Sequence, residues 1–268
     1  GQESHRQDIF PFFKHGGTSL KAEIQEGDAV MMAHILKYCC IDAYVDLVGL
    51  EFTRTYFPKL FYFEGEWHYR NDGSYELGTA EGGRKIFLMG MNYLNEYKSS
   101  REALNTYYLK TIHHEFTHIL HQTVEFSTAY QFITTDYKVD KCFNREFADF
   151  LSRGFITDYA QKNYHEDFAE MVSTYVTSTA DEWEALLKKA SYAPVKDKDG
   201  NLVYDSNGLV VADTKTKANG RDLIEQKLSI MRSYMQDQWG IDIDELRASI
   251  LQRENDVVNG KVDLKNLD

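Results

Sequence analysis

The sequence contains few cysteines and few prolines for a chain of 268 residues. Its three cysteines, Cys39, Cys40 and Cys142, cannot form a paired framework, and neighbouring cysteines bridge only through a strained ring. We therefore expect all three to be buried as small apolar side chains, the usual environment of a free cysteine. The three prolines do not mark a linker, and we find no internal repeat or low-complexity tract. A single domain over residues 1–268 is therefore the predicted organisation.

Long hydrophobic runs and an excess of positive charge are also missing. The apolar stretch from Ala29 to Leu36 is interrupted by His34 and is shorter than the ~20 residues that span a bilayer, so we expect no transmembrane span. Forty-two acidic residues against 30 basic ones give a formal net charge of −12. That charge would repel a phosphate backbone, and no basic stripe offsets the repulsion. The composition therefore argues against nucleic acid as a partner.

Apolar residues make up 43% of the sequence and aromatic residues 14%, which is enough to bury a sizeable core. Apolar positions at helical spacing predict a buried helix over residues 27–48. Ser99, with Glu102 three positions later, starts an apolar ladder and predicts a long helix that ends near Gln122. Between these two helices, aromatic and β-branched clusters separated by glycines predict short strands and hairpins, at residues 59–63, 67–70, 75–79 and 85–89.

The second half of the sequence predicts a helical lobe. Residues 196–208 show the pattern of a surface hairpin or mobile loop. Its Asp-x-Asp-Gly segment resembles a calcium loop but lacks the bidentate Glu that ends such a loop. The predicted fold class is therefore α+β, with a strand-rich N-terminal lobe over residues 1–122 and a helical C-terminal lobe over residues 123–268. Helical patterns, with Asp181 and Asp242 as start signals, cover residues 146–159, 166–177, 181–190, 221–238 and 244–254.

The motif HExxH, from His114 to His118, lies inside the helix that ends near Gln122. At about 3.6 residues per turn, His114 and His118 share one face, so both imidazoles can reach a single tetrahedral ion. Glu115 flanks that face, where its carboxylate can reach an attacking water rather than the metal. His113 points to another face, as a surface or packing residue. A structural zinc would add a fourth Cys or His, and Cys142 has no CxxC partner, so an open catalytic site is favoured over a structural one or a chance motif.

Two histidine ligands require a third protein ligand, and the sequence offers alternatives. Glu166 and Glu170 lie one helical turn apart, so Glu166 can bind the metal while Glu170 accepts a hydrogen bond from a ligand imidazole. These acids can instead be the acidic start of a helix that complements its dipole. His121 shares the face of His118, but about 10 Å along the axis separates it from His114, too far for one ion to bind three imidazoles. We therefore predict that His121 lies beside the ligands or in the cleft wall.

With these segments the sequence resembles the gluzincin metallopeptidases, which combine HExxH with a ligand Glu on a second helix. The strings HHEFTHILHQ (113–122) and EDFAE (166–170) look most like those of zinc-binding metallopeptidases found as substrate-import-associated lipoproteins in bacteria. EDFAE is also similar to the ligand helix of toxin-type gluzincins, where a tyrosine seven positions before the ligand Glu stabilises the oxyanion. Tyr159 stands at that offset, and Tyr164 is the second choice. The resemblance implies a zincin-type two-lobed fold with Glu166 as the third zinc ligand.

This pattern predicts a zinc-dependent metallopeptidase in which a water activated by the metal attacks the peptide bond, with Glu115 as general base. The resemblance further implies an extracytoplasmic protein, periplasmic or on the cell surface, that is lipid-anchored to the outer membrane through a cysteine before Gly1. Its substrates would be polypeptides or glycopeptides, and its partner an outer-membrane import complex. The alternative is a non-catalytic zinc-containing binding subunit of that complex, whose aromatic clusters around residues 56–69 contact protein or glycan. The intact Glu115 favours the peptidase, since a binding module needs no base beside the metal.

Overall fold

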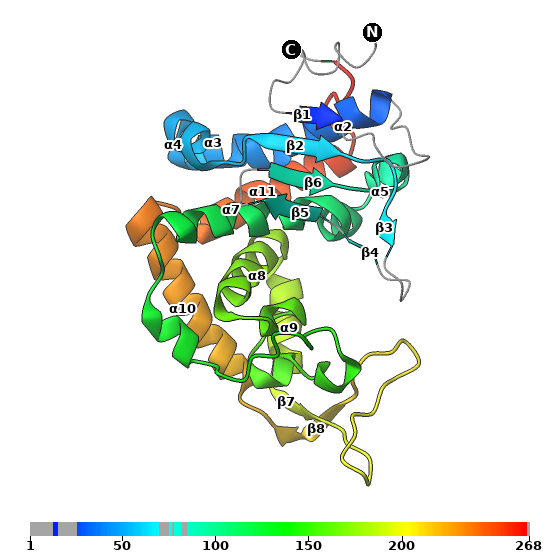
Figure 1. The fold of residues 1–268 in the computed structure, drawn as a ribbon, viewed down its shortest axis with the longest axis vertical. Helices are drawn as coiled ribbons and strands as arrows, with labels where there is room; N and C mark the ends of the chain where they lie inside the picture. Colours follow the sequence, from blue (N-terminus) through cyan, green and yellow to red (C-terminus); the bar gives the residue numbers. More distant parts are fainter. Residues whose placement is uncertain (1–12, 16–25, 70–74, 77, 82–84, 267–268) are drawn as a thin grey trace. The chain divides into compact units, whose positions relative to one another are not determined.

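The computed structural model describes residues 13–15, 26–69, 75–76, 78–81 and 85–266 (Figure 1). Contacts within the chain group it into two compact units, unit 1 (Gly1–Thr123 with Asp244–Asp268) and unit 2 (Val124–Ile243). The first segment of unit 1 ends next to the predicted boundary between residues 122 and 123. Residues 244–268, which the sequence prediction grouped with the helical lobe, belong instead to unit 1. Among the described residues, no helix is both long enough and apolar enough to cross a membrane.

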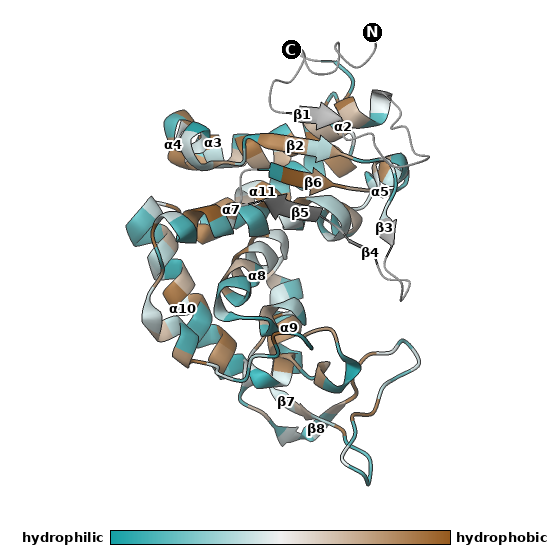
Figure 2. Ribbon diagram, in the orientation of Figure 1, coloured by the Kyte–Doolittle hydropathy of each residue, from teal (hydrophilic) through white to brown (hydrophobic). Residues whose placement is uncertain are grey.

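Unit 1 contains a four-stranded sheet with the order β1-β2-β6-β5 (Figure 1). Its central strands β2 (Leu60–Phe63) and β6 (Lys85–Leu88) pair in parallel and are largely hydrophobic (Figure 2). On the outer sides, β1 (Phe13–His15) is parallel to β2, and β5 (Gly78–Glu81) is antiparallel to β6. Every second side chain of the central strands is buried, which places one face of the sheet in the core: Phe61, Phe63, Ile86 and Leu88.

The strand predictions are right for β2 and β6 and need correction elsewhere. The predicted strand 75–79 is divided between β4 (Tyr75–Glu76) and β5, and β3 (His68–Tyr69) covers part of the predicted strand 67–70. Residues 70 and 77 lie outside the described residues. The hairpin prediction holds for β3 with β4 and for β5 with β6. The parallel pairing of β2 with β6, which requires a longer crossover, was not predicted. β1 was not predicted.

The predicted helix over residues 27–48 is confirmed with a change of winding in its middle. It consists of α2 (Glu26–Leu36), the π-helical stretch η1 (Lys37–Ile41) and α3 (Asp42–Val48). After Gly49 the chain continues as α4 (Leu50–Tyr56), which packs against the later helix α7 (Lys110–Thr123). Cys39 and Cys40 are fully buried in η1, and Cys142 of unit 2 is also buried, so the expectation for the cysteines is confirmed.

The predicted long helix of unit 1 is also confirmed. It follows the short η2 (Met91–Tyr93) and α5 (Leu94–Tyr97), and comprises α6 (Arg101–Leu104), the π-helical η3 (Asn105–Leu109) and α7 (Lys110–Thr123). The capping residue is Ser100 rather than Ser99, since the Ser100 side chain accepts a hydrogen bond of 3.1 Å from the Ala103 amide. The C-terminal helix α11 (Ile243–Val258) contacts this assembly through Glu254, which accepts a 3.0 Å hydrogen bond from the Asn105 side chain.

The aromatic segment between residues 56 and 69 contributes mainly to the core of unit 1. Phe57, Phe61, Phe63 and Trp67 are buried, whereas Tyr56 and Tyr62 are half-buried. The Phe57 ring lies 5.1 Å from the Phe116 ring of α7, centroid to centroid. Packing therefore accounts for most of this aromatic cluster.

Unit 2 is largely helical, and three of its predicted helices are confirmed: α8 (Tyr164–Thr177), α9 (Ala180–Ala190) and α10 (Gly220–Trp239). α10 packs against both α8 and α9. The start of α9 is a capping box of Thr179 and Glu182. The predicted start signal Asp181 lies in the first turn of the helix, and Thr179 is the capping residue. A short 3-10 helix, η4 (Thr128–Phe132), precedes these elements.

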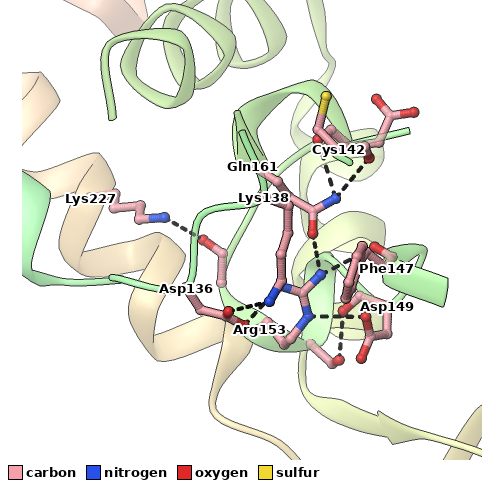
Figure 3. Close-up of polar contacts among 11 residues, drawn as sticks. Asp136, Lys138, Cys142, Phe147, Asp149, Arg153, Gln161 and Lys227 are labelled. Atoms are coloured by element: carbon pink, nitrogen blue, oxygen red, sulfur yellow. Dashed lines mark hydrogen bonds and ion pairs between the residues drawn. The ribbon is translucent and has the colours of Figure 1, made fainter. Parts of the chain in front are cut away.

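Residues 146–159, predicted as a helix, instead form turns with three short 3-10 helices: η5 (Arg145–Phe147), η6 (Leu151–Arg153) and η7 (Tyr159–Gln161). The Arg153 guanidinium group holds this irregular segment together (Figure 3). It donates to Asp149 Oδ1 at 3.0 Å, to Asp136 Oδ2 at 3.2 Å and to the Phe147 carbonyl at 3.1 Å. Gly154 follows with a φ of 91°, a left-handed conformation that ends helical winding.

The hairpin prediction between residues 196 and 208 is confirmed in part. β7 (Tyr192–Pro194) and β8 (Ala212–Lys217) pair antiparallel, and isolated bridges join Lys196 to Leu202 and Tyr204 to Val210. The Asp197 carboxylate accepts hydrogen bonds from the amides of Asp199 and Asn201, at 2.9 and 3.0 Å. This carboxylate of the calcium-like segment thus stabilises its own turn.

Candidate metal centre

Three histidines of α7 lie in a row along one face of the helix in unit 1. His118 is the central one: its Nε2 lies 3.0 Å from His114 Nε2, and its Nδ1 lies 2.7 Å from His121 Nε2. The His118 ring is nearly perpendicular to the other two, with interplanar angles of 84° to His114 and 80° to His121. His114 and His121 are buried and His118 is half-buried. The spacing of four residues therefore brings two imidazole nitrogens to one point beside the helix.

The separation of 3.0 Å between the Nε2 atoms is compatible with two ligands of one zinc ion. Zinc–nitrogen bonds of about 2.05 Å at a tetrahedral angle place two ligand nitrogens about 3.3 Å apart. The same distance also fits an N–H···N hydrogen bond, so the spacing permits a metal without requiring one. If His118 Nε2 faces a metal, the ring proton is on Nδ1, which then donates to His121 Nε2. His121 would thereby fix the tautomer and the orientation of His118.

Glu115 and His113 flank His114 in sequence but have different environments. Glu115 is half-buried, whereas His113 is fully buried. The Nδ1 of His113 lies 2.9 Å from the Tyr44 hydroxyl oxygen, and its Nε2 lies 3.7 Å from the Cys40 sulfur. Desolvation by burial lowers the pKa of His113 to about 3, so this ring is neutral near pH 7. His113 is a packing residue, and the alternative that it lies on the helix surface is wrong.

In unit 2, α8 presents Glu166 in its first turn and Glu170 one turn later. Asn163 caps the helix, since its side-chain oxygen accepts a hydrogen bond of 2.9 Å from the Glu166 amide. Glu166 is half-buried and Glu170 is buried. Glu170 Oε1 accepts a hydrogen bond of 2.8 Å from the Thr157 hydroxyl. Glu166 stands where an acidic side chain also complements the helix dipole, so its position suits both interpretations of this acidic turn.

The two tyrosines considered for the oxyanion also lie in unit 2. Tyr159 is part of η7, which packs against α8. Its half-buried ring stacks on Phe143, with centroids 5.8 Å apart and an interplanar angle of 5°, and the Lys162 ammonium nitrogen lies 5.5 Å from the ring centroid. Tyr164, at the start of α8, packs its ring against His165 at a centroid distance of 4.2 Å.

The predicted site residues thus form two sets. α7 brings His114, His118 and His121 together in unit 1, and α8 carries Glu166 and Glu170 in unit 2. That Glu166 joins the histidine pair at one metal remains a prediction. Asn163 and Thr157 were not among the predicted site residues, although Asn163 stands three residues before Glu166, a spacing typical of a helix N-terminus.

Comparisons with known proteins point to one family. A family model described as "Putative zinc-binding metallo-peptidase" matches residues 23–244, a range that includes both α7 and α8. A crystal structure of a "putative zinc-binding metallo-peptidase" from Bacteroides caccae ATCC 43185 is similar to this chain, with 29% sequence identity and a TM-score of 0.74. The match covers 100% of this chain and 97% of that chain. A search of the curated proteins finds no match. The chain therefore belongs to the family described as "Putative zinc-binding metallo-peptidase".

Proposed function

We propose that the protein is a zinc-dependent peptidase whose zinc ion is held by His114, His118 and Glu166. The observation that carries the proposal is the convergence of His114 Nε2 and His118 Nε2, 3.0 Å apart, on the HExxH helix. Membership of a family described as zinc-binding metallo-peptidases supports it. The chemistry of the donors also supports it, because two imidazoles and one carboxylate are a set that can hold a metal ion and leave a fourth position open.

A bound zinc ion would supply Lewis-acid polarisation of the substrate carbonyl and lower the pKa of a water molecule towards about 7. Glu115 would accept a proton from the attacking water and later return it to the leaving amine. Its half-buried position on α7 suits this role. Glu115 flanks the face of His114 and His118, from which its carboxylate would reach the attacking water without being a metal ligand. With Glu166 as the third ligand, the protein would be a gluzincin-type enzyme, as the sequence resemblance implies.

The remaining residues of the proposed site would orient the reacting groups. His121 would accept the hydrogen bond from His118 Nδ1 and so hold that ring in place. Glu170 would accept a hydrogen bond from a ligand imidazole, while Thr157 fixes one of its carboxylate oxygens. The Tyr159 hydroxyl would donate to the developing oxyanion, with its ring orientation set by stacking on Phe143. Tyr164 is the second choice for that donor.

We further propose, from the resemblance to import-associated lipoproteins, that the protein acts on extracellular polypeptides or glycopeptides. In that setting it would be lipid-anchored to the outer membrane and would work beside an import complex. The natural precursor should then carry a lipoprotein signal whose lipidated cysteine precedes Gly1. Reading the precursor sequence tests this point, and a cytosolic start with no signal would refute it.

A cleavage assay tests the peptidase proposal directly. Zinc-loaded protein is incubated with a broad library of quenched fluorescent peptides and glycopeptides and with denatured proteins, alongside Glu115→Gln as the matched control. We expect cleavage by the native chain and a loss of about 10²–10⁴-fold in Glu115→Gln, since that change removes the base but leaves the ligands. Chelator should abolish the cleavage, and added zinc should restore it.

Two outcomes would contradict the proposal. Equal cleavage by the native chain and by Glu115→Gln would identify a contaminating protease. Zinc-replete protein that cleaves no peptide, glycopeptide or denatured protein would favour the non-catalytic binding subunit.

A further inference from the structure

An ion pair is buried in unit 2 immediately behind the first turn of α8. Lys227 of α10 and Asp167 of α8 lie 2.7 Å apart, nitrogen to oxygen, and both side chains have 0% exposure. The Lys227 ammonium group also donates to the Gly154 carbonyl at 2.7 Å, in the segment that carries Arg153 (Figure 3). Asp167 Oδ2 accepts a second hydrogen bond, of 2.9 Å, from the Tyr137 hydroxyl. The ammonium group further lies 4.3 Å from the centroid of the Phe155 ring.

Net stabilisation is a weak explanation for this pair. Removing two charges from water is costly, and a well-packed neutral pair of similar volume is often as stable or more stable. A buried charged pair does impose one geometry, because each charge must meet its partner and the remaining donors and acceptors. The pair is therefore better explained by the structural elements that it holds in register.

Those elements are the ones that carry the two glutamates of the proposed site. Asp167 directly follows Glu166, so the ion pair fixes the helical turn from which Glu166 projects. Gly154 lies three residues before Thr157, whose hydroxyl holds Glu170 at 2.8 Å. Lys227 thus connects α10 to both the Glu166 turn and the turn that supports Glu170.

Gly154 allows α10 to approach this turn closely. A Cβ atom at residue 154 would lie 2.7 Å from Leu223 Cβ, and Leu223 stands one helical turn before Lys227 on α10. The Gly154 φ of 91° is also a conformation that side-chain-bearing residues rarely adopt. A glycine at residue 154 therefore allows α10 to pack closely enough for Lys227 to donate to the Gly154 carbonyl.

We propose that Lys227 and Asp167 are positioning residues for the metal-binding carboxylate. By joining Asp167 to the Gly154 carbonyl, Lys227 holds the first turn of α8 and the Thr157 turn in one arrangement, so that Glu166 is pre-oriented for the metal. This inference rests on the proposed function, since it takes Glu166 as a zinc ligand. It adds a buried ion pair that acts on the site without contacting the substrate or the metal.

The test uses the nearly isosteric neutral pair Asp167→Asn/Lys227→Met in the full chain. Removing both charges together leaves no buried charge unpaired, and the Asp167→Asn change keeps a side-chain oxygen for the Tyr137 hydroxyl. Three quantities are measured: the zinc Kd by competition with a chelator, the visible absorption spectrum of the cobalt-substituted protein, and the thermal unfolding of the metal-free protein. Arg221→Met is the matched control, because Arg221 also lies on α10 but forms an exposed ion pair, with Glu184 of α9.

We expect the double variant to unfold near the native temperature but to bind zinc about tenfold more weakly, as is typical when support of a metal ligand is lost. Its cobalt spectrum should change, because the spectrum reports the geometry of the ligands. Arg221→Met should keep the native zinc Kd and spectrum. A folded double variant with native zinc Kd and an unchanged cobalt spectrum would overturn the proposal.

Tyr137→Phe decides the question if the double variant does not fold. This change removes one hydrogen bond to Asp167 and keeps the ring that packs on Phe155 at a centroid distance of 5.3 Å. A two- to threefold weaker zinc Kd supports the proposal, and an unchanged Kd overturns it. Glu166→Ala, measured in parallel, distinguishes a wrong ligand assignment from a wrong positioning role. Native zinc affinity in Glu166→Ala overturns the ligand assignment and this inference with it. If Glu166→Ala loses zinc affinity while the folded double variant keeps the native affinity, only the positioning role is overturned.

Discussion

At the scale of single residues, neighbouring histidines of α7 differ because of what each ring faces. His113 is enclosed by Tyr44 and Cys40, whereas His114 and His118 turn their Nε2 atoms to each other. The sequence could separate the pair from His113, since four-residue spacing repeats on one helix face. It could not decide between a surface and a buried His113, because Tyr44 lies 69 residues away in the chain. The role of His121 beside His118 followed from the pitch of the helix alone.

The third ligand is the residue-scale question that mutation can answer. We expect Glu166→Ala to weaken zinc binding by at least about 100-fold, because a direct ligand contributes more than the tenfold to 100-fold of its supporting partners. His121→Ala should weaken binding by about tenfold, since only the orientation of His118 is lost. The zinc Kd is measured by competition with a chelator. Asp181→Ala, at an acidic position in the first turn of α9, is the control and should not change the Kd. The ligand role passes to His121 if its variant loses zinc while Glu166→Ala retains it.

At the scale of helices and strands, local patterns predicted the elements that repeat regularly. The helices α7, α8, α9 and α10 were found from their apolar periodicity, and two strands of the sheet from their aromatic clusters. The failure at residues 146–159 has a physical cause, since the contacts of Arg153 with Asp136 and with the Phe147 carbonyl compete with helical winding. The π-helical stretches η1 and η3 also escaped prediction. Each is about a single turn inside a longer helix, too short to be distinguished from its α-helical neighbours by apolar spacing.

Close packing at the start of α10 gives an element-scale prediction. A Cβ atom at Gly220 would lie 2.1 Å from the Leu151 carbonyl oxygen and 2.6 Å from the Ala190 carbonyl oxygen. Both are backbone atoms that cannot move without shifting η6 or the end of α9. We expect Gly220→Ala to lower the free energy of unfolding by about 3 kcal/mol or more. Gly27→Ala in α2 is the control: no atom lies within 4 Å of its added Cβ, so it should be neutral or slightly stabilising. Denaturant unfolding compares the two, and equal midpoints would contradict the close approach.

At the scale of the whole molecule, the sequence predicted the α+β class but not the composition of the two units. The last helix, α11, belongs with the first half of the chain. Its Asp256 accepts a 2.7 Å hydrogen bond from the Tyr38 hydroxyl, across a separation of 218 residues, and its Glu254 accepts one from Asn105 across 149 residues. Local periodicity carries no information on pairs so distant in the chain. For the same reason the buried partners Asp167 and Lys227 were not foreseen, although both residues lie in correctly predicted helices.

Removal of the metal gives a prediction for the stability of the whole chain. A ligand that binds only the folded protein stabilises it by mass action, by about 2.7 kcal/mol when its free concentration is 100 times its Kd. For a chain of 268 residues this corresponds to an unfolding temperature about 5 °C higher with zinc than with chelator. Differential scanning calorimetry should show that shift in the native chain and equally in Glu115→Gln, because Glu115 is assigned as a base and not as a ligand. The shift should vanish in His118→Ala, which lacks the imidazole whose Nε2 lies 3.0 Å from His114 Nε2. A full shift that persists in His118→Ala would place the zinc elsewhere in the protein, and a shift lost in Glu115→Gln would make Glu115 a ligand.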